Sequence, residues 1–118
     1  MGTVVLDISE PGIAIVILEG EHELYGAVEL SRRLQALIEE GVSVVIDLTR
    51  ATFLDSSIVS VFLQTRREAR EAQTGFSIVM DDTTGSSIRR MFEITGLGSI
   101  LPVVDSREAA LARAKLAA

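Results

Sequence analysis

The sequence of 118 residues contains no cysteine and no tryptophan. The absence of cysteine excludes disulfide bridges, thiol catalysis and cysteine-rich metal sites. No stretch approaches the roughly 18 consecutive apolar residues that suggest a membrane-spanning helix, and the first residues lack the basic start of a signal peptide. We therefore expect a cytoplasmic protein that does not insert into a membrane.

Positive charge is scarce as well. The chain has 11 Lys and Arg against 17 Asp and Glu, which gives a formal net charge of −6. Proteins that bind the phosphate backbone of nucleic acids gain much of their affinity from basic side chains, so direct nucleic-acid binding is not expected. An acidic surface instead favours a neutral or basic protein partner. The length suits one domain, and we expect residues 1–118 to form it.

The first half of the chain predicts a β-hairpin, a helix and a third strand. Alternation over Val4–Ile8 is typical of an edge strand, whereas the continuous apolar run Ile13–Leu18 indicates an interior strand. Apolar residues recur at helical spacing from Leu24 to Glu40, and Gly41 suits the left-handed position after a helix. The β-branched run Val42–Ile46 then predicts a buried central strand.

The second half continues this alternation of strands and helices. A stripe of Ile58, Phe62, Thr65 and Ala69 indicates an amphipathic helix. The remaining elements expected are a strand over Phe76–Met80, a helix over Ile88–Thr95 closed by Gly96, and a last strand over Ile100–Val104. Because Pro102 cannot donate to a strand ladder, that last strand should lie at the sheet edge.

A final helix should be capped by Asp105 and present Ala109, Ala112 and Leu116 as its apolar stripe. Strands that alternate with helices in this way are typical of the α/β class. We expect a mixed sheet of about five strands with about four helices.

Asp55-Ser56-Ser57 falls at the start of a helix, just beyond a strand end. One interpretation is structural, because a short side-chain oxygen there accepts from the amides of the first turn. The other is functional, because a phosphate on a hydroxyl at this point would be tolerated by the helix dipole. Residue chemistry alone leaves both open.

Enzyme and metal sites are poorly supported. The single histidine, His22, could act as a base to Ser56 with Asp47 or Asp55 as its orienter, but the segment around Ser56 is no G-x-S-x-G elbow. A lone histidine near a strand end is usually a solvated side chain. Asp81-Asp82 offers too few ligands for a dedicated calcium site. We expect no enzymatic activity, no cofactor and no metal.

Three stretches resemble the STAS-domain anti-sigma factor antagonists of bacteria. The segment VVIDLTRATFLDSSIVSVFL resembles the family's phosphorylation-site segment, in which a strand ending in D-L is followed by D-S-S or D-S-T and a helix. Gly20–Leu24 resembles the G-E-L-D stretch of the family, and Ile88–Leu97 resembles its later helix and T-G-L turn. The order and distances of the three match, so the resemblance covers nearly the whole chain and implies a single STAS domain.

The resemblance implies a switch that is controlled by a partner. Ser56 aligns with the phosphoacceptor of the family. In the unmodified form such proteins bind an anti-sigma factor that is also a serine kinase, and this binding frees a sigma factor. Phosphorylation breaks the complex between the antagonist and the anti-sigma factor. The residues implied at the partner surface are Glu21, Glu23, Asp55, Ser56 and Ser57.

Ile58 departs from the family, which usually has Gly after D-S-S. It either faces the core as part of the helix stripe or stands at the partner surface, and we favour the core. An alternative function keeps the fold without the switch: STAS-like domains also serve as scaffold subunits or as cytoplasmic partners of membrane transporters, including lipid-transport ATPases.

Overall fold

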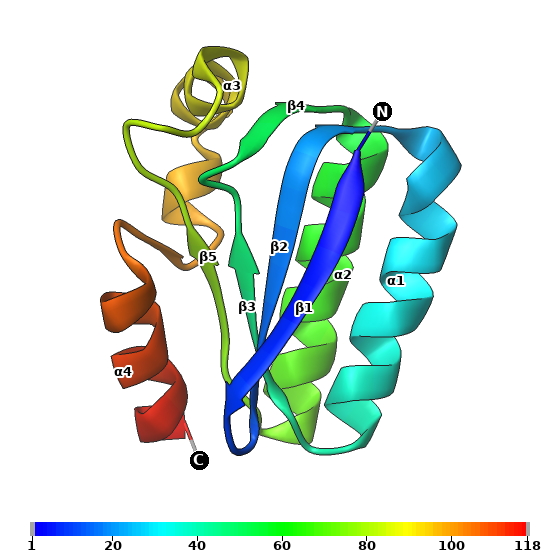
Figure 1. Ribbon diagram of the computed structural model, residues 1–118, viewed down its shortest axis with the longest axis vertical. Helices are drawn as coiled ribbons and strands as arrows, with labels where there is room; N and C mark the ends of the chain where they lie inside the picture. Colours follow the sequence, from blue (N-terminus) through cyan, green and yellow to red (C-terminus); the bar gives the residue numbers. More distant parts are fainter. Residues whose placement is uncertain (1, 118) are drawn as a thin grey trace.

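The computed structural model describes residues 2–117, in which six strands and four helices form an α/β fold (Figure 1). Short β-branched runs form the strands and amphipathic segments form the helices, as their hydrophobic periodicity predicts. Among residues 2–117, no helix is both long and apolar enough to cross a membrane. In chain order the elements are β1 (Thr3–Glu10), β2 (Ile13–His22), α1 (Leu24–Glu39), β3 (Ser43–Asp47), β4 (Ala51–Leu54), α2 (Ser56–Ala72), β5 (Phe76–Val79), α3 (Ser86–Thr95), a 3₁₀ turn (Leu97–Ser99), β6 (Val103–Val104) and α4 (Arg107–Ala117).

The sheet is mixed, with the strand order β1-β2-β3-β5-β6. Of the strands formed by residues 2–117, only β1 runs antiparallel to its neighbour, since it forms the predicted hairpin with β2. The other pairs are parallel, which places the carboxyl ends of β2, β3, β5 and β6 at the same end of the sheet. The prediction of a central third strand is confirmed. The short strand β4 pairs with the end of β2 beyond the end of β3.

Helices cover both faces of the sheet, but unequally. Alternate residues of β2 and β3, such as Val16 and Val44, face α1 and α2 in the larger core. The residues between them, such as Ile15 and Val45, face α4 in a smaller cluster. This explains why the run Ile13–Leu18 shows no polar alternation, because both of its faces are buried.

Helix α2 follows the stripe expected from the sequence. Its buried side chains are Ile58, Val61, Phe62, Thr65 and Ala69. Ile58 is fully buried in the larger core, so the core interpretation of this residue is confirmed. Gly41 and Gly96, which follow α1 and α3, have φ angles of 79° and 70° and so occupy the left-handed region that favours glycine.

The last strand is shorter than predicted. Only Val103–Val104 pairs with β5, at the sheet edge as expected. The chain before it turns through the 3₁₀ segment, where the amide of Leu101 donates to the carbonyl of Leu97 at 2.8 Å. This turn keeps Ile100 out of the ladder, whereas the Pro102 carbonyl still accepts from Ile78 N at 3.0 Å.

Two expectations for the final helix are wrong. Ser106 rather than Asp105 caps α4, because the Ser106 hydroxyl accepts from the amide of Ala109 at 3.0 Å. The buried side chains are Ala110 and Ala114, whereas Leu116 is exposed. A helix composed largely of alanine has little apolar asymmetry, so the position of its buried stripe is weakly encoded in the sequence.

Candidate functional site

The predicted site residues gather where β2 and β4 end and α1 and α2 begin. Strand β4 pairs in parallel with β2, with His22 opposite Leu54. It is held from behind by the start of α3, because Gly85 N donates to the Ala51 carbonyl at 2.9 Å. A Cβ atom at Gly85 would lie 2.7 Å from the Thr52 carbonyl oxygen, so only glycine allows this close approach.

Asp55 joins the starts of two helices. Its Oδ1 atom accepts from the backbone amides of Ser57 at 3.0 Å and Ile58 at 3.3 Å, which caps α2. Its Oδ2 atom accepts from the amide of Leu24, the first residue of α1, at 3.0 Å. The Ser57 hydroxyl, followed by these amides, holds the pKa of the Asp55 carboxyl below its usual value, although some loss of hydration opposes the effect. The capping interpretation of the segment is confirmed.

The two serines after Asp55 have different surroundings. Ser57 is half-buried, and its hydroxyl donates to Asp55 Oδ1. Ser56 is the first residue of α2 and is exposed, as expected. Its carbonyl oxygen accepts from the Ser60 hydroxyl at 3.0 Å, which ties its backbone into the helix. Of the two hydroxyls, the one on Ser56 is therefore the more accessible to an enzyme.

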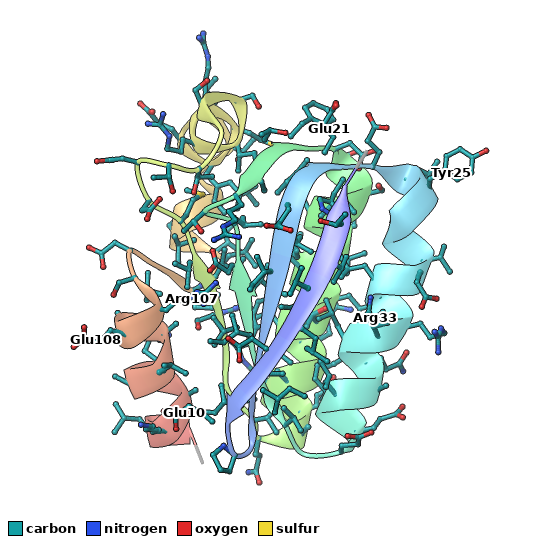
Figure 2. The ribbon with its side chains drawn as sticks, in the orientation of Figure 1. Glu10, Glu21, Tyr25, Arg33, Arg107 and Glu108 are labelled. Atoms are coloured by element: carbon teal, nitrogen blue, oxygen red, sulfur yellow. The ribbon has the colours of Figure 1, made fainter. Side chains whose placement is uncertain are left out.

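The end of β2 presents acidic side chains around a buried histidine. Glu21 and Glu23 are exposed, and Figure 2 shows Glu21 projecting at this end of the molecule. His22 between them is only 7% exposed, and its Nε2 atom lies 3.0 Å from the Glu19 carbonyl oxygen. The expectation of a solvated histidine is wrong because His22 belongs to β2, where successive side chains point to opposite faces.

Apolar side chains flank these carboxylates. Leu24, Tyr25 and Val28 are exposed on the first turns of α1, and Phe53 of β4 is partly exposed at 38%. Figure 2 shows Tyr25 extending away from α1. We call these four residues the apolar flank. Sequence reasoning missed them, although the three residues on α1 lie off the core stripe of that helix, which is the signal that could have found them.

The acidic turn after β5 is organised by its own side chains. Asp81 Oδ1 accepts from Thr83 N at 2.8 Å, and the Thr84 hydroxyl accepts from Asp81 N at 3.1 Å. The Thr83 hydroxyl and amide hold the pKa of the Asp81 carboxyl below its usual value. Within the described part of the chain, no group of three or more His, Cys, Asp or Glu side chains is placed to hold a metal ion.

An accessible serine, exposed carboxylates and an apolar flank thus lie together at one end of the sheet of this α/β domain, and exposed apolar side chains with a polar surround are typical of interaction surfaces. The sequence model of the family described as "Mlab, STAS domain" matches residues 6–104. The chain therefore belongs to the STAS domain family, and the resemblance inferred from its motifs is confirmed.

Individual relatives agree with this assignment. The chain is 35% identical over 107 residues to BtrV of Bordetella bronchiseptica, a candidate anti-sigma factor antagonist, and the match covers 90% of each protein. An anti-sigma factor antagonist from Mycobacterium paratuberculosis has a similar crystal structure, with a TM-score of 0.80 and 25% identity over 98% of this chain and 95% of that chain.

The phosphorylated form of the Bacillus cell fate determinant SpoIIAA shares the fold. Its TM-score is 0.67 at 21% identity, over 91% of this chain and 96% of that chain. The names of the first two relatives describe anti-sigma factor antagonists.

Proposed function

We propose that this protein is an anti-sigma factor antagonist of the cytoplasm that, when unphosphorylated, binds an anti-sigma factor with serine kinase activity and so frees a sigma factor. Phosphorylation of Ser56 ends the binding. The observation that carries this proposal is the exposed Ser56 at the first turn of α2, beside the capping carboxylate of Asp55. Its support from relatives lies in their description as anti-sigma factor antagonists.

Ser56 is a better phosphoacceptor than Ser57 for a local reason. The Ser57 hydroxyl already donates to Asp55, so it would have to break a hydrogen bond to a charged group before it could accept a phosphoryl group in a kinase active site. Its half-buried position also restricts the approach of a kinase active site. The Ser56 side chain is exposed, so no such rearrangement is needed.

A phosphate on Ser56 would act on the interface more than on the fold. It would add about −1.5 to −2 charges at pH 7. The positive end of the α2 dipole offsets part of this charge within the molecule. At a contact with another protein, however, the same group brings bulk and a large desolvation cost, because two adjacent negative charges, the phosphate and Asp55, would lose their hydration together. The unmodified surface is therefore the one that binds.

The surface around Ser56 fits a partner with an apolar patch and basic rim. Glu21 and Glu23 supply negative charge, and the apolar flank supplies area that becomes buried on association. Aromatic and aliphatic side chains at the centre of an interface usually contribute most of its affinity, with charged residues setting orientation and association rate. Asp55 fixes the starts of both helices that carry this surface.

The test compares the binding of the cognate anti-sigma factor kinase to Ser56→Asp and Ser56→Ala by calorimetry. We expect Ser56→Asp to bind at least about tenfold more weakly than Ser56→Ala, since a desolvated charge opposes the contact. Gln64→Glu is the matched control, because it adds one negative charge at an exposed position of α2 about 12 Å further along the helix. It should bind as the unmodified protein does.

Phosphate transfer identifies the acceptor. Incubation with the kinase and labelled ATP should modify the Ser57→Ala variant and leave Ser56→Ala unlabelled. Labelled phosphate on the Ser56→Ala variant would assign the phosphorylation site to another hydroxyl. Equal affinities of the Ser56→Asp and Ser56→Ala variants for the kinase would reject the charge switch. Recovery of the native protein with a transport ATPase, and without phosphate at Ser56, would favour the transporter-partner alternative.

A further inference from the structure

A groove lined by arginines lies toward the opposite end of α2 from Ser56. It has a volume of about 440 Å³ and lies between α2, the start of β5, the turn that leads into β6, and α4. Along the helix axis, Arg66 and Arg70 are about 15 and 21 Å from Ser56. The arginine groove therefore shares no residue with the surface proposed to bind the anti-sigma factor.

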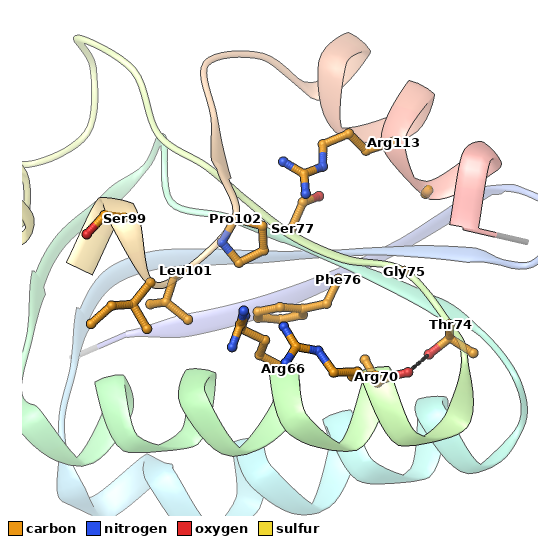
Figure 3. A pocket seen from close by; sticks show the side chains of 13 residues that line it. Arg66, Arg70, Thr74, Gly75, Phe76, Ser77, Ser99, Leu101, Pro102 and Arg113 are labelled. Atoms are coloured by element: carbon orange, nitrogen blue, oxygen red, sulfur yellow. Dashed lines mark hydrogen bonds between the residues drawn. The ribbon is translucent and has the colours of Figure 1, made fainter. Parts of the chain in front are cut away.

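Three guanidinium groups enter the groove from two walls. Figure 3 shows Arg66 and Arg70 rising from α2 and Arg113 reaching from α4 on the other side of β5. Among residues 2–117, no carboxylate side chain lines the groove. Some other arginines of the chain pair with carboxylates, as Arg50 does with Glu19 at 2.9 Å and Arg107 with Asp47 at 2.6 Å, whereas others, such as Arg33 and Arg90, have no ion-pair partner among residues 2–117.

The three groove arginines have no such partner among residues 2–117. Unlike the scattered unpaired arginines elsewhere on the surface, these three line one hollow. Guanidinium groups pair with phosphate and carboxylate oxygens through two parallel hydrogen bonds, which makes arginine clusters effective sites for oxyanions. The charge of the groove thus fits an anionic ligand.

The sheet edge inside the groove is open. The amides of Ile78 and Met80 donate to the carbonyls of Pro102 and Val104, each at 3.0 Å. Because these donors alternate along a strand, the amide of Phe76 faces the same edge, where β5 is not yet paired with β6. Pro102 has no N–H group, so it cannot donate to β5 in return. The groove thus adds a backbone donor to the three guanidiniums.

The groove also has an apolar part. Phe76 lies beside Arg66 and Arg70 in Figure 3, and Ile100, Leu101 and Pro102 line the wall before β6. Its volume falls within the range of small-molecule sites and exceeds what one phosphate group fills. We infer that the groove binds a small organic phosphate, whose phosphate group pairs with the arginines while its apolar part packs on Phe76.

Phenyl phosphate is a suitable probe because it combines a phosphate with one aromatic ring. In an amide NMR titration of the full chain at constant ionic strength, we expect shifts at residues 74–77 and at the arginine side-chain N–H groups. Phenyl phosphate should bind at least about tenfold more tightly than inorganic phosphate, since only the former uses the apolar wall. Phenol alone should leave the spectrum unchanged. Equal affinities for phenyl phosphate and inorganic phosphate would overturn the assignment of an organic ligand.

Substitutions in two elements test the charge of the site. Arg66→Gln on α2 and Arg113→Gln on α4 should each weaken phenyl phosphate binding by about tenfold or more, because each removes a charge-assisted pair. The matched control is Arg67→Gln, which removes the same charge from an exposed neighbour that does not line the groove. Its affinity should stay within about twofold of the unmodified protein.

Spectra outside the groove verify that each variant is folded, and the use of two elements keeps the test valid if one variant unfolds. Equal weakening by all three substitutions would show non-specific attraction to positive charge and would overturn the proposal. Absence of shifts at residues 74–77, or shifts centred on Arg89 and Arg90 of α3, would overturn it as well.

Discussion

The two faces of the sheet are packed by different means. On one face, α1 and α2 bury large side chains such as Leu34 and Phe62 in a continuous core. On the other face, α4 contributes the small side chains of Ala110 and Ala114. Large interlocking side chains fix the rotation of a helix strongly, whereas alanine methyl groups allow several rotations at similar energy.

On the face covered by α4, a polar contact adds to the weak apolar packing of the smaller cluster. Arg107, at the start of α4, donates from Nε to Asp47 Oδ2 at 2.6 Å, and the Asp47 side chain is only 1% exposed. The other oxygen of Asp47 accepts from the amide and hydroxyl of Thr49 at 2.8 and 2.7 Å. Figure 2 shows Arg107 between α4 and the sheet. One directional contact therefore positions a helix that packing alone would hold loosely.

The largest loss of stability should come from a substitution in the larger core. Ile58→Gly should lower the free energy of unfolding by about 2–5 kcal/mol, because it removes a fully buried side chain, leaves a cavity and adds a glycine to a helix. Chemical denaturation provides the measurement. The exposed Gln64→Gly variant isolates the helix-propensity term and should lose only about 1 kcal/mol.

Partner binding separates packing from recognition at Ile58. Since this side chain faces the core, affinity per folded molecule should not change in the glycine variant. A small stability loss together with a clear change in affinity would contradict the packing role.

A substitution at the contact that anchors α4 should lower the stability less, and its effect should be confined to that helix. Arg107→Gln should cost about 1–3 kcal/mol, because the buried carboxylate of Asp47 loses a charged donor while the site stays partly open to water. Hydrogen exchange should show protection lost in α4 and retained in α2. Arg90→Gln, at an exposed position of α3, is the control for the loss of one positive charge, and an equal effect there would refute the anchoring role.

The smallest effect should come from the end of α4. Leu116→Ser should change the free energy of unfolding by less than about 0.5 kcal/mol, since Leu116 is exposed. The stripe expected from the sequence would instead have made this a core substitution with a loss of several kcal/mol. Thermal unfolding distinguishes the two cases, and a large loss of stability would show that Leu116 belongs to the buried stripe of α4 after all.

Sequence reasoning succeeded where apolar side chains are large and periodic. The stripe of α2 and the central position of β3 were predicted because each rests on several branched or aromatic residues. It failed for α4, where most of the apolar residues are alanine, and for β6, where a 3₁₀ turn displaces the predicted strand. In both places the outcome depends on tertiary contacts that local periodicity does not encode.

The candidate site shows the same division. Asp55 and the exposure of Ser56 followed from capping rules and from the position of the helix start. Strand β4 was missed because its burial pattern, with Ala51 and Leu54 buried and two exposed residues between them, does not alternate. The apolar flank was missed because single exposed apolar residues are common, and only the fold brings these to one end of the sheet.

Within residues 2–117, strand β1 has no neighbouring strand on its outer side, and Val5, Leu6 and Ile8 on it are exposed. Such an edge invites pairing with another copy of the chain and hence aggregation. A register shift between Asp7 and Glu10 interrupts the regular ladder there. Arg107 and Lys115 of α4 lie 4.0 Å and 3.8 Å from the carboxylates of Asp7 and Glu10. A strand arriving at this edge would meet an irregular backbone beside partly exposed charged pairs, which disfavour edge-to-edge pairing. Because α4 supplies the basic member of each pair, this weakly packed helix also helps to protect the protein from its own copies.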